Sequence, residues 1–227
     1  MRSIYERVLG EKEFGRLHPR IRERFGFSSR DGKAAIGRGV MDDVWHGPVY
    51  TLPFLYIGTW RRIMFPERGR SVPFTIENWA YVDPLGRETV TWLRTFETRK
   101  RRRFDAYMIH AESRGRIVDY LGTHQHLAVD IDISVDEKTR GMRLRSGEQR
   151  FYEGKIAFRF PMLFSGVADV LESFDDALGK YRIEVAVSNR VWGRLFGYRG
   201  TFDVEWRAAR PEDVPQSAKP NRVEKRE

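Results

Sequence analysis

The chain contains no cysteine among its 227 residues. This absence excludes disulfide bonds, thiolate metal ligands and a cysteine nucleophile, and it is compatible with either redox compartment. The opening stretch MRSIYERVLG also lacks the apolar core and the small-residue cleavage site of a secretory signal. We therefore expect a cytoplasmic protein.

Motifs for nucleotide binding, nucleophilic catalysis and base recognition are absent as well. The sequence has no phosphate loop, no G-x-G-x-x-G turn and no G-x-S-x-G elbow. It also has no zinc finger, recognition-helix pattern or RNA-binding signature. No cofactor is predicted, nucleic acid is not favoured as a partner, and whether the protein is an enzyme stays open.

Long apolar runs are few, and the longest candidate is interrupted. Segment 47–66, GPVYTLPFLYIGTWRRIMFP, is broken by Pro53, Gly58, Arg61 and Arg62. A membrane-spanning helix needs about 20 mostly apolar residues, so this segment does not fit one. It predicts a short helix that covers the sheet, with an element lying in a membrane interface as the alternative.

Positive charge is in excess. Lysine and arginine total 41 against 32 acidic residues, a net charge of +9. Such an excess favours an anionic partner, whether nucleic acid, acidic lipid or a small acid, without choosing among them. The run RKRRR forms a candidate anion patch, although a solvated hairpin tip is the alternative. The patch consists of Arg99, Lys100, Arg101, Arg102 and Arg103.

Alternation of apolar and polar residues dominates from residue 72 onward. We predict strands near 72–82, 87–97, 103–112, 115–121, 124–135, 140–151, 154–160, 168–175, 180–188 and 197–207. Their connections are short, and short connections join only antiparallel neighbours. The fold prediction is all-β, either a curved antiparallel meander sheet or a partly closed β-barrel, because closure removes exposed strand edges.

The two ends of the chain differ from this strand region. Ser3 and Glu6 have the spacing of a helix capping box, and residues 1–26 are predicted to be helical. Segment 28–39 is rich in turn residues, and a short strand is expected over 40–45. We predict one β-rich domain over residues 1–207, with the antiparallel strands in 72–207. The polar, proline-containing tail 208–227 is predicted to be disordered.

The stretch HQHLAVDIDISVDE raises the question of a metal site. Its alternation places His124 and His126 on the acidic face, opposite an apolar face that begins at Leu127 and Val129. If the apolar face looks into the core, both histidines look toward water. Two histidines followed by an acid also suit zinc, iron or manganese inside a barrel. Because no further ligand is evident, no metal site is predicted.

Polar side chains on otherwise apolar strand faces indicate a ligand site, since burying them is costly unless they are paired. Arg94 lies among Val90, Trp92 and Phe96, and it can fork onto a carboxylate or phosphate. The alternative is a structural ion pair of Arg94 with an acid such as Glu112. The predicted ligand-binding residues are Asn78, Trp92, Arg94, Phe104, His110 and Glu112.

Three hypotheses for function follow. The leading one is a binding module for an amphipathic anionic small molecule, such as a lipid-like acid, inside a barrel cavity. In it, Arg94 holds the head group, Trp92 and Phe104 the apolar body, and His110 adds a hydrogen bond. The second is an enzyme or enzyme partner that uses His110 and Glu112 in acid–base chemistry, with the catalytic residues otherwise unknown. The third is a peripheral protein that binds acidic membrane or nucleic acid through basic patches.

Five segments carry a resemblance to a known family: YERVLGEKEFGRLHPRIRERFG, GRGVMDD, VPFTIE, ETVTWLRTFETRKRRRF and LFGYRGTFDVEW. Over residues 4–207 the chain resembles a bacterial domain-of-unknown-function family. That family occurs alone or fused C-terminal to a saccharopine-dehydrogenase-like dinucleotide-binding domain. The resemblance implies no particular chemistry, but the fusion implies a redox or lipid-metabolic setting. A separate dinucleotide-binding oxidoreductase is thus a candidate partner.

Overall fold

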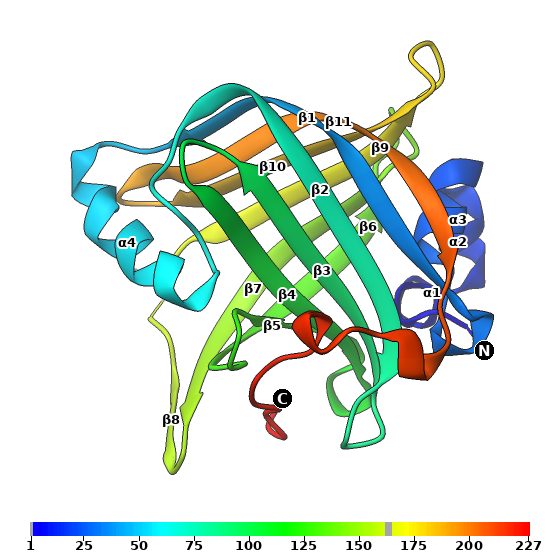
Figure 1. Cartoon of the computed structure of the whole chain (residues 1–227). Helices are drawn as coiled ribbons and strands as arrows, with labels where there is room; N and C mark the ends of the chain where they lie inside the picture. Colours follow the sequence, from blue (N-terminus) through cyan, green and yellow to red (C-terminus); the bar gives the residue numbers. More distant parts are fainter. Residues whose placement is uncertain (1, 162–164) are drawn as a thin grey trace.

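A computed structural model describes residues 2–161 and 165–227 of the chain. Within them, eleven strands form one antiparallel sheet in the order β6-β5-β4-β3-β2-β1-β11-β10-β9-β7-β8. The sheet closes because β6 also pairs with β7, so ten strands form the wall of a barrel and β8 extends the β7 hairpin (Figure 1). This confirms the all-β prediction, with full closure in place of a partly closed sheet.

The ten strands predicted after residue 72 correspond to β2 through β11. Their bounds are β2 (Gly69–Val82), β3 (Glu88–Glu97), β4 (Arg101–Ala111), β5 (Arg116–Leu121), β6 (Leu127–Val135), β7 (Met142–Glu153), β8 (Ile156–Arg159), β9 (Val167–Asp175), β10 (Lys180–Asn189) and β11 (Gly193–Ala208). Most of these neighbours along the chain are neighbours in the sheet, which is the arrangement that short connections require.

The first strand is longer than the sequence predicts. Strand β1 (Lys33–His46) spans 14 residues and includes most of the segment expected to be turns. It pairs with β11 on one side and β2 on the other. A Cβ at Gly37 would come within 2.5 Å of Ile76 and 2.8 Å of Phe202, and one at Gly39 would collide with the backbone of Thr201. The glycines here mark close packing in the wall and not a turn.

Three short helices cover one end of the barrel. They are α1 (Ile4–Leu9), α2 (Glu11–Arg16) and α3 (Pro19–Phe25), and the N-cap of α1 is Ser3, whose side chain accepts a hydrogen bond from Glu6 N at 3.1 Å. Their buried side chains join the barrel core. On α3, Arg24 forms an ion pair with Glu172 of β9, and both side chains are almost fully buried. This end is therefore closed by packed side chains.

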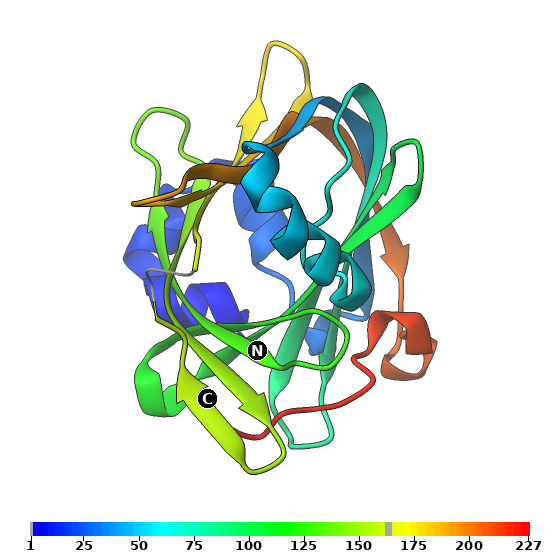
Figure 2. The ribbon, with the colours of Figure 1, turned by 90° about the vertical axis from the view of Figure 1, so that its left-hand side faces the viewer.

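The helix predicted within segment 47–66 lies across the other end of the barrel. Helix α4 (Leu52–Arg61) follows the short helix η2 (Val49–Thr51) and crosses the opening, as the view along the barrel shows (Figure 2). Leu55 is its inward anchor, being only 1% exposed. In the described part of the chain, no helix has the length and apolar character needed to cross a membrane.

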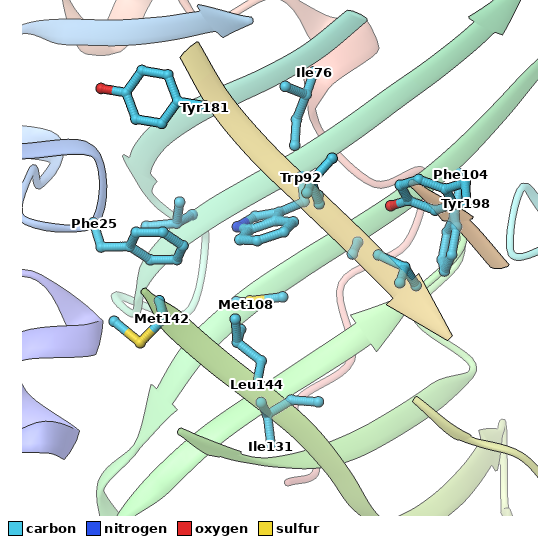
Figure 3. Packing of buried hydrophobic residues seen from close by; sticks show 14 of the residues in the cluster. Phe25, Ile76, Trp92, Phe104, Met108, Ile131, Met142, Leu144, Tyr181 and Tyr198 are labelled. Carbon is cyan, nitrogen blue, oxygen red and sulfur yellow. The ribbon is translucent and has the colours of Figure 1, made fainter. Parts of the chain in front are cut away.

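The barrel interior is packed with aromatic and aliphatic side chains toward the helical end. Phe25 of α3 lies against Trp92 with ring centroids 5.9 Å apart, and the Trp92 indole donates a hydrogen bond to the Tyr5 hydroxyl at 2.8 Å. Met108, Met142 and Tyr181 lie close by (Figure 3). The inward faces are the ones that alternation predicts. Trp92 thus marks the depth at which the packed core begins.

Strand pairing in the wall is irregular at β7, whose edge is shared by two strands. Residues Met142–Arg145 pair with β9, and Arg150–Glu153 pair with β8. Between these ladders, side chains make the connection. Ser146 Oγ accepts a hydrogen bond from Ala168 N at 2.7 Å, and Gln149 Nε2 donates one to the carbonyl of Gly166 at 2.7 Å.

The tail after β11 lies along the outside of the barrel, whereas its composition predicts disorder. It contains the short helices η5 (Pro211–Asp213) and η6 (Gln216–Ala218) and runs past β3, β4 and β5 (Figure 1). Val214 and Ala218 join a second apolar cluster on the outer face with Tyr107 and Tyr120. The tail covers aromatic side chains on the outer face of the barrel, where alternation would leave them in contact with solvent.

Candidate functional site

The barrel encloses a cavity of about 700 Å³ between α4 and the packed core. Its wall is mostly apolar and includes Val129, Ile131, Leu144, Val170, Val185 and Val187. Phe54 and Trp60 of α4 also line it and are largely exposed, so the cavity reaches the surface beside this helix. A cavity of 300 to 1,000 Å³, apolar apart from a few polar groups, is typical of small-molecule sites.

Arg94 lines this cavity and is 4% exposed. Its Nη1 donates a hydrogen bond to the Tyr198 hydroxyl at 3.1 Å, and its Nε donates one to the Phe104 carbonyl at 3.3 Å. The guanidinium lies 3.7 Å from the centre of the Phe104 ring. Neutral groups and an aromatic face thus hold the cation in place without neutralising its charge.

Asp119 of β5 also lines the cavity, and sequence reasoning missed it. The residue is 6% exposed, and its Oδ1 has no hydrogen-bond partner among the described residues. Burial raises the pKa of this carboxyl to about 7, against the opposing effects of the Arg94 charge and a backbone hydrogen bond from Tyr107. Ile117 and Leu121 share its strand face, but Val118 and Tyr120 make the opposite face apolar as well, so alternation alone does not identify the inward side.

The six predicted ligand-binding residues divide into two groups. Trp92, Arg94 and Phe104 line the cavity, as the leading hypothesis requires. Asn78, His110 and Glu112 are not among its lining residues. Asn78 is buried at the helical end beside Phe25, where its amide donates to the Thr91 carbonyl at 2.8 Å.

His110 and Glu112 are not brought together as an acid–base pair. Glu112 is exposed in the short helix η3 (Glu112–Arg114), whereas His110 is half-buried near the end of β4. Burial and the nearby positive charge of Arg7 lower the pKa of His110. Arg94 does not pair with Glu112, because its hydrogen-bond partners are Phe104 and Tyr198. The polar centre of the cavity is Arg94 with Asp119.

The two histidines of the H-x-H stretch lie at the cavity entrance, not on the solvent face of a strand. Both precede β6, and their rings stack with centroids 5.5 Å apart. His124 Nδ1 accepts a hydrogen bond from Arg61 Nη1 at 3.1 Å, and burial together with that charge lowers the pKa of His124. His126 lies 2.9 Å from a carboxylate oxygen of Glu153.

A metal site is not formed there. Over residues 2–161 and 165–227, no group of three or more histidine or acidic side chains is arranged to hold a metal ion. Cationic neighbours such as Arg61 and Arg222 surround the two histidines instead. The entrance is therefore a polar rim of rings and charges around an apolar interior.

The predicted anion patch at 99–103 is largely neutralised by the protein itself. Arg101 forms an ion pair with Glu97 at 3.1 Å, and Arg102 pairs with Glu67. Arg103 pairs with Asp105 at 3.0 Å. Arg99 and Lys100 are exposed in the turn between β3 and β4. This arrangement resembles a solvated hairpin tip more than a concentrated anion site.

Comparison with known proteins gives a family without an assigned chemistry. A curated relative from Bacillus subtilis (strain 168), "Uncharacterized protein YndH", is 32% identical over 209 residues, which is 91% of this chain and 99% of the relative. No solved structure matches the chain. The family model "Domain of unknown function (DUF4166)" matches residues 17–202, which include Arg94, Asp119, strands β1 to β10 and most of β11. The chain therefore belongs to the DUF4166 family.

Proposed function

We propose that the barrel binds an amphipathic anionic small molecule, such as a lipid-like acid, in its cavity. One observation carries the proposal. A buried arginine and a buried carboxyl oxygen without a partner both line a cavity that is otherwise apolar. Buried polar groups are normally satisfied, so a polar head group is the partner that this part of the cavity lacks. Apolar lining toward the entrance suits a hydrocarbon body.

The chemistry of the two groups favours an acid as the head group. The Arg94 guanidinium stays charged throughout the physiological pH range and donates to carboxylate or phosphate oxygens. Asp119, with a pKa of about 7, is partly protonated at neutral pH and donates a hydrogen bond in that form. Binding of an anion is therefore expected to tighten as the pH falls through 7, because the competing negative charge of Asp119 disappears.

The test compares a naturally fluorescent polyene fatty acid with the corresponding fatty alcohol. Wild-type protein is expected to bind the acid at least about tenfold more tightly, a difference of about 1.4 kcal/mol. Arg94→Met keeps an unbranched side chain as far as the position of Nε but removes the charged guanidinium, so it should bring the two affinities close together. The matched control is Arg145→Met, an exposed arginine on the outer face of β7.

Two outcomes oppose the proposal. If wild-type protein binds neither compound, the cavity does not accept an apolar body. If it binds acid and alcohol equally well, Arg94 does not recognise the head group. Native mass spectrometry of the purified protein provides an independent measurement, since a bound acid adds a defined mass that Arg94→Met should lose and Arg145→Met should keep.

A further inference from the structure

Exposed apolar side chains gather around the entrance of the cavity. They come from three segments that surround the opening: η2 with α4, the β7–β8 hairpin and the β10–β11 turn (Figure 2). We call this set the mouth surface. It consists of Tyr50, Phe54, Ile57, Trp60, Ile156, Phe158, Val191 and Trp192, which are 44% to 76% exposed. Val49 and Tyr56 belong to the same segment and are 78% and 61% exposed.

The mouth surface is continuous with the cavity. Phe54, Ile57 and Trp60 belong to the cavity lining although each is at least 66% exposed. Tyr50 and Trp192 join α4 to the β10–β11 turn, with ring centroids 5.7 Å apart and a hydrogen bond from the Tyr50 hydroxyl to the Trp192 carbonyl at 2.8 Å. Contiguous exposed apolar surface of this kind marks an interaction site.

The charges interleaved with these side chains are of one sign. Ranges 44–66, 154–161 and 185–195 contain no aspartate or glutamate. They carry six basic residues, which are Arg61, Arg62, Lys155, Arg159, Arg190 and Arg194. Arg61 stacks over the Trp60 ring at 4.2 Å. Two of the six have an acidic partner outside these ranges: Arg159 lies 3.2 Å from Glu148 with its side chain still 81% exposed, and Arg62 lies 3.3 Å from Asp105. Each of the three segments therefore presents aromatic or aliphatic groups beside cations.

We infer that the mouth surface docks on the surface of an anionic lipid bilayer. Tryptophan and tyrosine rings favour the interface between head groups and hydrocarbon, and arginine and lysine beside them attract anionic head groups. Each basic residue near such a surface contributes a modest electrostatic attraction that salt weakens. We choose a bilayer as the occupant because the apolar wall of the cavity continues onto the docked face. A hydrocarbon chain can then pass between bilayer and cavity without contact with water.

Docking by itself does not depend on what the cavity holds, whereas loading of the cavity from the bilayer rests on the function proposed above. The two are separable by experiment. Vesicle binding is measured without added fatty acid, and binding of the polyene acid is measured without vesicles. Failure of docking with intact binding of the polyene acid would overturn only this inference.

The experiment is flotation of the full chain with vesicles of phosphatidylcholine alone or with about 30 mol% phosphatidylglycerol. Binding should require the anionic lipid and weaken at least tenfold on raising salt from about 0.05 to 0.5 M. Phe54→Ser with Trp60→Ser should reduce binding at least tenfold. The matched control is Val82→Ser with Leu85→Ser, two exposed apolar residues (57% and 49%) at the β2–β3 turn.

Further variants and outcomes sharpen the test. Arg61→Gln with Arg159→Gln should lower binding to anionic vesicles, whereas Arg38→Gln with Arg182→Gln on the outer wall should not. Absence of binding at low salt would overturn the inference, as would equal binding to neutral and anionic vesicles. A concentration-dependent dimer that Phe54→Ser with Trp60→Ser abolishes would also overturn it, because the mouth surface would then be covered by a second copy.

Discussion

A single carboxyl group gives the cavity its most unusual chemistry. Asp119 lies in a strand segment, RIVDYL, whose alternate residues Ile117 and Leu121 face inward. The pattern is weaker than the one that identifies Arg94, because Val118 and Tyr120 make the opposite face of β5 apolar as well. The depth of Asp119 along the barrel axis and its unpaired oxygen could not be predicted, since alternation gives at most the face of a strand and not the position along that axis.

Because alternation gives no position along the barrel axis, it also could not predict that Asn78 and His110 lie outside the cavity lining. Both alternate with core residues along their strands, yet neither lines the cavity, and Asn78 lies at the end closed by the helices. Which inward residues meet a void depends on how far α1, α2 and α3 enter the barrel. That depth is set by tertiary packing of Tyr5 and Phe25 against Trp92.

Substitution of Asp119 is expected to change how stability depends on pH. Its pKa is higher in the folded protein (about 7) than the ordinary value of 3.8, so the folded state gains relative stability when the carboxyl is protonated and loses it as the pH rises through 7. Between about pH 6 and pH 8.5 the wild type should lose roughly 1.4 kcal/mol relative to Asp119→Asn. Urea unfolding at both pH values measures this difference.

The control for this measurement is Asp132→Asn, a side chain on the outer face of β6 that is 67% exposed. Its stability relative to wild type should not vary over the same pH interval. A difference between Asp119→Asn and wild type that stays constant with pH would contradict the buried, poorly solvated state of the Asp119 carboxyl.

At the level of elements, the strands were the most predictable part of the chain and β1 the least. Short turns and alternation located β2 to β11 within a few residues. In β1, glycines at 37 and 39 weaken the strand pattern, and their role depends on Ile76 and Phe202, which are distant in sequence. Helix α4 lies across the barrel as the sequence predicts, and it covers the opening while leaving Phe54 and Trp60 exposed.

The C-terminal tail gives an element-scale prediction. If it packs as the structure shows, Val214→Ser should lower the free energy of unfolding by about 2 kcal/mol, because a buried apolar side chain is lost from the outer cluster. The neighbouring exposed substitution Gln216→Ser should have little effect. Equal unfolding midpoints for both variants and wild type would instead indicate the disorder that the composition of 208–227 predicts.

At the scale of the whole molecule, closure of the sheet creates an interior that side chains do not fill. The helical end is packed, whereas the end under α4 retains about 700 Å³. Sequence patterning predicts a curved sheet or a partly closed barrel from the number and antiparallel order of the strands. It does not predict the cavity volume, which is the difference between two large quantities, the enclosed space and the side-chain volume.

Filling that space should separate ligand binding from stability. Ala168 of β9 lines the cavity, and Ala168→Phe places a ring in it without removing a packed group. We expect the affinity for the polyene fatty acid to fall at least about tenfold while the urea midpoint stays the same or rises. Ala186→Phe, on the outward face of β10, is the control. Undiminished binding by Ala168→Phe would place the ligand elsewhere.

The joint in the wall at β7 has a mechanical consequence. At this position the backbone ladder between β7 and β9 has ended, and β7 is connected to Ala168 and Gly166 through the hydroxyl of Ser146 and the side-chain amide of Gln149. Such side-chain hydrogen bonds are few and are individually weak. If neighbouring strands of the wall separate, we expect them to separate here. This stretch therefore sets how readily the interior can be reached through the wall.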